Sequence, residues 1–180
     1  MLKIINDSDP RLRARSLPVS LPLSLEEEEI AQAMLNYVKK SQDEEYAKKH
    51  NMQGAVGLAA PQIAVFKRLI AIYYLKENSK PMELLLANPR ITASSLRECY
   101  LRDGEGCLSV PEKRLGRVYR PWKVTVEAYD ILTKQEVKLI LRGYDAVVIQ
   151  HEIDHLNGVL YYDHIDPKRA LEDDPSVVVI

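Results

Sequence analysis

Cysteine is scarce in this chain, which has only Cys99 and Cys107 among its 180 residues. The sequence alone allows a disulfide between them, but two cysteines do not make the dense framework of small secreted domains. We therefore expect a reducing, cytoplasmic compartment. The first ten residues agree, because they contain Asp7 and Asp9 and no apolar stretch after a basic start, so neither a signal nor a transit peptide is predicted.

Charge imbalance and long apolar runs are also missing. The net charge is −1 with 28% charged residues, which gives no electrostatic reason to expect a nucleic acid or an anionic membrane as partner. No apolar run approaches the roughly 20 residues of a bilayer span. The length and the 46% hydrophobic content predict one domain over residues 1–180 that buries its own core. No heptad pattern is present, so we expect a monomer.

The spacing of apolar residues predicts helices at two places. Ser24 to Glu27 forms a capping box, which starts an amphipathic helix that runs to about Lys48. A second helix is expected over residues 143–156, with Asn157 and Gly158 as its C-cap. Segments rich in β-branched residues predict strands at residues 68–74, 83–87, 123–129, 137–141 and 173–180. This order favours an α+β fold with mostly antiparallel strands.

Residues 150–155 read Gln-His-Glu-Ile-Asp-His and place an H-E-x-x-H pattern on the second predicted helix. Residues four apart on a helix lie about 40° apart around the axis and about 6 Å apart along it, so His151 and His155 can reach one metal ion. Glu152 follows His151 directly and can act as a base toward a water at the metal. The pattern predicts a hydrolytic metal centre on a central helix surrounded by the strands.

A catalytic site of this kind usually has three protein ligands and one open position, so a third ligand is needed. The longer metzincin pattern fits Gly158 but puts Tyr161, not histidine, at its third ligand position. His164 comes three residues too late for that pattern. Glu172 is a carboxylate further along the chain, but nothing around it supports a role as a distal ligand.

Cys107 is the better candidate for the third ligand. It lies in the segment Gly104-Glu105-Gly106-Cys107-Leu108-Ser109, where the flanking Gly106 lets the backbone approach a ligand closely. A thiolate that binds a cation is deprotonated outright. Taken alone, however, a lone cysteine is more often a small buried hydrophobe, which is how we interpret Cys99.

Three motifs occur in a specific order: Gly-Leu-Ala-Ala-Pro-Gln at 57–62, Glu-Gly-Cys-Leu-Ser at 105–109, and Gln-His-Glu-Ile-Asp-His at 150–155. Together they resemble the three signatures of peptide deformylase. Asp9-Pro-Arg-Leu-Arg13 also resembles the N-terminal segment of that family, so the resemblance covers nearly the whole chain. The longer spacing before Gly104 and the tail without a long final helix resemble the class common in Gram-positive bacteria.

The resemblance implies a metal-dependent hydrolase that removes the N-formyl group from the N-terminal formyl-methionine of newly made proteins and releases formate. It implies Cys107, His151 and His155 as metal ligands. Glu152 would take a proton from water and pass it to the leaving amine. The side chain of Gln62 and the backbone N–H of Leu108 would stabilise the oxyanion.

The resemblance also implies a substrate cleft, in which an extended peptide pairs with the chain like an added strand. The residues expected to line it are Val56, Gly57, Gly106, Tyr144, Val147 and Val148. The two valines also suit the inner face of a buried helix, and both roles are compatible. Asp154 is expected either to pair with Arg120 near the site or to lie exposed on the helix.

A Cys/His/His set suits Zn²⁺, Fe²⁺, Co²⁺ or Ni²⁺, and spacing alone does not choose among them. The resemblance implies Fe²⁺ as the native ion, with Zn²⁺, Ni²⁺ or Co²⁺ as substitutes. The expected partners are nascent N-formylmethionyl polypeptides at the ribosome, without direct nucleic-acid binding or a membrane.

Two alternatives belong to other classes of function. One is a zinc endoprotease with Tyr161 or Glu172 as an unusual third ligand. The other is a peptide-binding or metal-binding relative without turnover, because Ala55 stands where the first motif of the family usually begins with glycine. The methyl group of Ala55 would narrow the approach of a peptide to the backbone.

Overall fold

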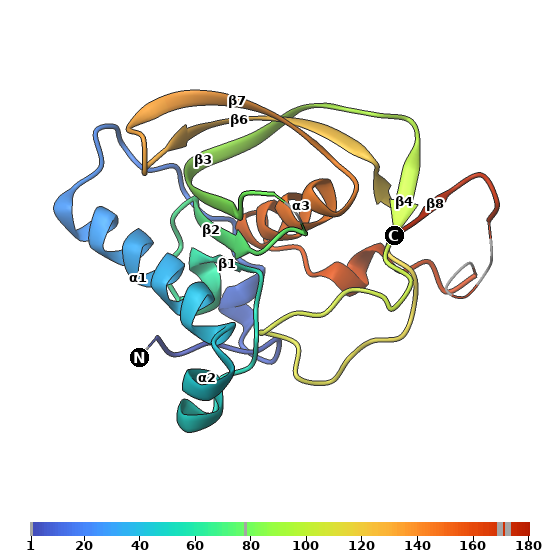
Figure 1. The fold of residues 1–180 in the computed structure, drawn as a ribbon, viewed down its shortest axis with the longest axis horizontal. Helices are drawn as coiled ribbons and strands as arrows, with labels where there is room; N and C mark the ends of the chain where they lie inside the picture. The colour runs from blue at the N-terminus through green and yellow to red at the C-terminus, as the bar shows by residue number, and fades with distance from the viewer. Residues whose placement is uncertain (1, 78, 169–170, 172–173) are drawn as a thin grey trace.

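The computed structural model describes residues 2–77, 79–168, 171 and 174–180. Its helices are α1 (Leu25–Ser41), α2 (Glu44–His50) and α3 (Tyr144–Leu156), with short 3-10 helices η1 (Pro10–Arg13), η2 (Ala60–Ile63) and η3 (Tyr161–His164). Its strands are β1 (Gly57–Ala59), β2 (Leu69–Tyr74), β3 (Met82–Ser94), β4 (Glu98–Tyr100), β5 (Arg120–Pro121), β6 (Lys123–Asp130), β7 (Gln135–Arg142) and β8 (Val178–Val179). Figure 1 shows their arrangement.

The strands form two sheets. The larger sheet has the order β1-β2-β3-β6-β7, and every neighbouring pair in it is antiparallel. The smaller sheet has the order β5-β4-β8, in which β8 runs parallel to β4. The predicted α+β class with mostly antiparallel strands is therefore confirmed.

Helices α1 and α3 pack on opposite faces of the larger sheet, as the alternation of β2 requires. Ile70, Ile72 and Tyr74 belong to the core cluster that contains the inner residues of α3. Leu69 and Ala71 belong to a second cluster, together with the apolar stripe of α1. In Figure 1, β1 and β2 lie between the two helices, so the edge strand β1 borders α3 directly.

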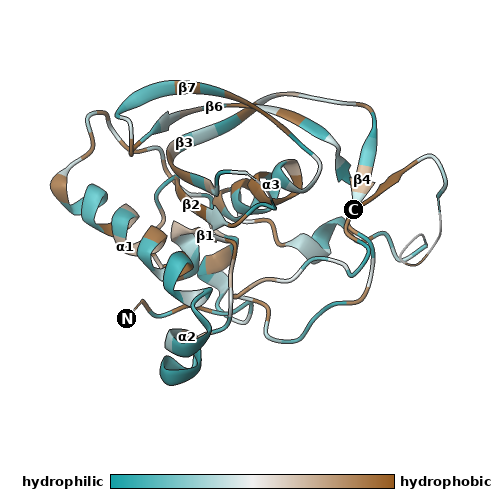
Figure 2. Cartoon of the chain, in the orientation of Figure 1, coloured by the Kyte–Doolittle hydropathy of each residue, from teal (hydrophilic) through white to brown (hydrophobic). Residues whose placement is uncertain are grey.

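The predicted first helix is wrong at its C-terminal end. Its capping box is confirmed, because Ser24 accepts from the Glu27 backbone and the Glu27 side chain reaches back to Ser24. The helix ends at Ser41, however, and Asp43 caps a separate α2 by accepting from the Tyr46 N–H. An N-cap carboxylate stabilises a new helix start, which divides the segment. Figure 2 shows α2 as mostly hydrophilic, and none of its residues is buried.

The other predicted elements differ from the structure mainly in length, while β1, β4 and β5 were not predicted. The predicted strands 123–129 and 137–141 are confirmed as β6 and β7, which form a hairpin, and the C-cap at Asn157 is also confirmed. The predicted strand 83–87 extends to Ser94, since register shifts after Ala87 and Ile91 let β3 bend and continue to pair with β6. Only Val178–Val179 forms a strand in the described part of the tail, and residues 172 and 173 lie outside the described residues. Among the described residues, no helix has both the length and the apolarity to cross a bilayer.

Candidate metal centre

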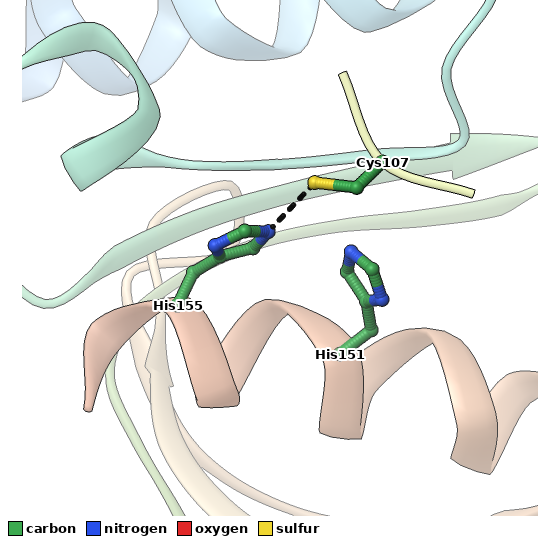
Figure 3. A group of neighbouring side chains, drawn as sticks. All are labelled: Cys107, His151 and His155. Atoms are coloured by element: carbon green, nitrogen blue, oxygen red, sulfur yellow. Dashed lines mark hydrogen bonds between the residues drawn. The ribbon is translucent and has the colours of Figure 1, made fainter. Parts of the chain in front are cut away.

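Three potential ligand atoms converge between α3 and the loop that follows β4. His151 and His155 project from one face of α3, and Cys107 faces them from the loop (Figure 3). One ligand atom from each of the three residues lies within 4.8 Å of the others. The Cys107 Sγ is 3.2 Å from His155 Nε2. A thiolate and two imidazoles at this separation are a suitable donor set for a transition-metal ion.

Glu105 fixes the orientation of His151. Its Oε2 lies 2.7 Å from His151 Nδ1. The carboxylate therefore accepts a hydrogen bond from the Nδ1–H, and the Nε2 lone pair is left to bind a metal ion. Burial alone would raise the pKa of Glu105, but hydrogen bonds and charges from His151 and Arg120 lower that pKa to about 2. Glu105 therefore stays ionised next to His151.

Arg120 connects Glu105 with α3. It donates from Nη2 to Glu105 Oε2 at 3.0 Å and from Nη1 to Asp154 Oδ2 at 2.8 Å, which confirms the expected pairing with Asp154. The Arg120 side chain is only 3% exposed. Although burial opposes it, the two carboxylates hold the pKa of Arg120 above its usual value. Asp154 also lies 2.8 Å from His164 Nε2, so His164 belongs to this network and not to the ligand cluster.

Glu152 lies beside the three potential ligands and is packed against β1. Its side chain is buried, and its Oε2 has no hydrogen-bond partner among the described residues. Burial, opposed by the nearby His151, raises the pKa of Glu152 to about 7. A β-carbon at Gly57 would lie 2.2 Å from Glu152 Oε1, so the close approach of strand and carboxylate requires glycine.

Gln62 is held with its amide donor directed at Cys107. Its Oε1 accepts from the Ala59 N–H at 2.8 Å, while its Nε2 lies 3.2 Å from Ser109 Oγ and 3.6 Å from Cys107 Sγ. Only 2% of Gln62 is exposed, so it is not a surface glutamine. The backbone of Leu108 follows Cys107 directly, and Leu108 also lines the cleft beside the ligand cluster.

A cleft of about 340 Å³ opens beside these residues. Its lining includes all six residues that were expected there: Val56, Gly57, Gly106, Tyr144, Val147 and Val148. Val147 and Val148 are also buried core residues, so both of their suggested roles hold. A β-carbon at Gly106 would meet no atom within 4 Å, so Gly106 borders open space and is not tightly packed.

Several cleft residues were missed by sequence reasoning. They are Gln42, Gln53, Gly54, Leu101 and Glu105. Gln42 was assigned to the interior of a long helix, and only its position just before the Asp43 cap would have indicated a helix end. The available signal for Glu105 was its place in the second motif, two residues before Cys107.

Of the two alternative third ligands, only Tyr161 lies among the described residues, and its ring is stacked near His151. The Tyr161 hydroxyl accepts a hydrogen bond from the Arg114 N–H at 2.9 Å. Glu172 lies outside the described residues. Cys99 and Cys107 are both free, so the disulfide that the sequence allowed is absent. Burial raises the pKa of the Cys99 thiol to about 11, in keeping with a core residue.

Comparisons with known proteins agree with this geometry. The family model of polypeptide deformylase matches residues 1–170. The peptide deformylase of Staphylococcus epidermidis, a Gram-positive bacterium, is 46% identical over 181 aligned residues, covering 100% of this chain and 98% of the relative.

Solved structures are similar as well. A probable peptide deformylase from Synechococcus phage S-SSM7 has a TM-score of 0.74 at 34% identity, covering 92% of this chain and 100% of that one. A class I type b peptide deformylase from Acinetobacter baumannii, solved with Met-Ala-Ser bound, has a TM-score of 0.71 at 31% identity, covering 92% and 98%. The similarity therefore extends over almost the whole of both chains.

Proposed function

The chain belongs to the polypeptide deformylase family and removes the N-formyl group from newly made proteins, and on this premise we propose a role for each residue of the site. The matching family and relatives are peptide deformylases, which favours this reaction over the endoprotease and over the binding protein without turnover. The observation that carries the proposal is the convergence of three ligand atoms within 4.8 Å, next to a buried glutamate.

We assign Cys107, His151 and His155 as the ligands of the catalytic metal ion. The neutral form suits His155 as a ligand, because burial and the neighbouring His151 hold its pKa well below the usual value. When bound, the cation supplies a Lewis acid that makes water a nucleophile near neutral pH. Fe²⁺ is the native ion in this proposal, with Zn²⁺, Ni²⁺ or Co²⁺ as substitutes, since a mixed thiolate and imidazole set accepts each of them.

Glu152 moves the proton. Its unpartnered Oε2 takes a proton from the attacking water as the formyl carbon becomes tetrahedral. A pKa near 7 lets the same carboxyl then deliver that proton to the leaving amine. Formate and a free N-terminal amine are the products.

Gln62 and Leu108 stabilise the negative charge that develops on the formyl oxygen. The Gln62 carbonyl is fixed by the Ala59 N–H, so its amide N–H groups keep their direction without reorganisation during the reaction. The Leu108 backbone N–H is the second donor. Because both donors flank Cys107, the oxyanion is placed next to the ligand cluster.

The cleft holds the peptide in an extended conformation. The backbones of Val56 and Gly57 on one side and Gly106 on the other pair with the main chain of the substrate. The methionine side chain enters the apolar pocket of Tyr144, Val147 and Val148. The Acinetobacter baumannii relative was solved with Met-Ala-Ser bound, and this supports an N-terminal methionyl peptide as the ligand of this cleft.

We further propose that residues 1–180 act as a single catalytic domain organised around α3 as its central helix. The core clusters support this, because the inner residues of α3 pack with residues from all five strands of the larger sheet. The enzyme works as a monomer in the cytoplasm, where it meets nascent chains at the ribosome.

The test of the function is a comparison of formyl-Met-Ala-Ser with acetyl-Met-Ala-Ser as substrates. The account expects formate release from the first peptide and little hydrolysis of the second, because a site that fits the small formyl group next to Gln62 and Cys107 excludes the additional methyl group of acetyl. Turnover of both peptides at similar rates would contradict it.

A further inference from the structure

Side chains at the C-terminal end of α1 bind the backbone of Ala55, which lines the cleft just before β1. Ser41 Oγ accepts from the Ala55 N–H at 3.0 Å and donates to the Val38 carbonyl at 2.7 Å. The Gln42 Nε2 donates to the Ala55 carbonyl at 2.8 Å. Both main-chain polar groups of Ala55 are therefore bound by neighbouring side chains, one from Ser41 and one from Gln42.

Gln42 makes a second hydrogen bond, to the next strand. Its Nε2 lies 2.6 Å from the Tyr73 carbonyl on β2. A primary amide has two N–H groups, and both are used here, one on Ala55 and one on Tyr73. Gln42 is thus a bridge between the segment before β1 and the strand beside it.

Without Gln42, the Tyr73 carbonyl would be the expected acceptor for the Val56 N–H at the end of the β1–β2 pairing. The paired register of β1 and β2 ends at Gly57 opposite Ile72, so the next opposed residues are Val56, just before β1, and Tyr73. The Tyr73 N–H donates to the Val56 carbonyl at 2.9 Å, and in such a pair the two residues normally exchange both hydrogen bonds. The reciprocal bond, from the Val56 N–H to Tyr73, is absent among the described residues, and Gln42 occupies that carbonyl instead.

We propose that Gln42 is a positioning residue for the substrate: by occupying the Tyr73 carbonyl, it keeps the Val56 N–H out of the ladder and leaves it for the main chain of the formyl peptide. This inference rests on the proposed function, because it assigns the freed donor to a peptide in the same cleft. Val56 and Gln42 both line that cleft. Ala55 directly precedes Val56, and the hydrogen bonds to its N–H and its carbonyl fix the backbone at that point.

Replacing Gln42 by leucine removes both donors while keeping a side chain of similar size. The Val56 N–H is then the nearest backbone donor to the Tyr73 carbonyl, and it closes the ladder. We expect the KM for formyl-Met-Ala-Ser to rise about five- to tenfold, the effect of one hydrogen bond lost to the substrate. The kcat stays within about twofold, because Cys107, His151 and Glu152 are untouched.

Gln32→Leu is the matched control, because Gln32 lies on the same helix with an exposed side chain bonded only to Asn36 among the described residues. Its KM should equal that of the wild type. Gln42→Met has a different shape and also lacks donors, so it should behave like Gln42→Leu. An unchanged KM in both Gln42 variants, or a loss confined to kcat, would overturn the proposal.

Amide hydrogen exchange at Val56 separates positioning from a merely structural role. In the zinc-loaded wild type, the proposal expects fast exchange at Val56 and protection when Met-Ala-Ser is added. In free Gln42→Leu it expects slower exchange than in the wild type, whereas general loosening would make exchange faster. Protection of Val56 in the free wild type would overturn the proposal.

These two measurements also distinguish this inference from the proposed function. If the wild type released no formate, the proposed function would fail, but the exchange at Val56 would still decide whether Gln42 keeps this donor free. If the wild type were active and neither KM nor exchange responded to Gln42, only the inference would fail.

Discussion

Gly57 and Glu152 are so close that a β-carbon at residue 57 would lie 2.2 Å from Glu152 Oε1. The substitution Gly57→Ala should therefore displace the carboxylate. A displacement of about 1 Å in a catalytic group can cost about 100-fold in rate, so we expect kcat to fall by about that factor while the metal content is unchanged. Gly54→Ala is the comparison, because its β-carbon would be 3.5 Å from the Ser41 carbonyl, an ordinary contact. A larger loss of kcat at Gly54 than at Gly57 would contradict this account.

Arg120 neutralises two buried or partly buried carboxylates, Glu105 and Asp154. Arg120→Met should lower the free energy of unfolding by about 3–5 kcal/mol, because it leaves these charges without their partner. Urea denaturation of the metal-loaded enzyme would measure the loss. The control is Arg90→Met, whose ion pair with Glu127 is exposed and should contribute about 1 kcal/mol or less. Equal stabilities of the two variants would refute the structural role of Arg120.

Gln62→Leu removes the side-chain donor to the oxyanion and the acceptor for the Ala59 N–H. Loss of one oxyanion donor typically costs about 100- to 1000-fold in kcat, or about 2.7–4 kcal/mol of barrier. We expect that loss in steady-state formate release, with a much smaller change in KM, because the donor acts mainly on the transition state. Gln32→Leu again serves as the control on an exposed face. A Gln62→Leu enzyme with the wild-type kcat would remove Gln62 from the mechanism.

Glu27 provides a test of pH dependence away from the metal centre. The hydrogen bond from Lys67 and that from the Ser24 backbone hold the pKa of Glu27 below its usual value. A carboxyl whose pKa is lower in the folded state stabilises above its unfolded pKa, about 4.5, and this contribution is lost as the pH falls through the folded value. The stability difference between wild type and Glu27→Gln should therefore be larger at pH 7 than at pH 3. A difference that grows on acidification would show the opposite sign and contradict the assignment.

The local part of the site was predictable from the sequence, because helical spacing alone brings His151 and His155 to one face. Cys107 was not predictable in this way. It comes from an irregular loop, and only the order of three motifs indicated that this loop meets α3. The pairing of Arg120 with Asp154 likewise connects β5 to α3, and the expectation that the two lie close together came from the family resemblance.

The cleft edge was the least predictable part of the fold. Strand β1 has only three residues, too few for an alternating pattern to be recognised. The apolar stripe of α1 gave no indication that the helix ends at Ser41, since that end depends on the local cap at Asp43. For this reason the roles of Ser41 and Gln42 at Ala55 emerge only from the tertiary structure.

The most direct test of the central claim compares Cys107→Ala with Cys99→Ala in enzyme prepared without oxygen. Each variant removes one buried thiol, but only Cys107 lies within reach of both histidines. Bound metal is measured by mass spectrometry, together with formate release from formyl-Met-Ala-Ser. The account predicts one bound iron and turnover in the wild type and in Cys99→Ala, and the loss of both in Cys107→Ala. A Cys107→Ala enzyme that keeps its metal and releases formate at the wild-type rate would contradict it.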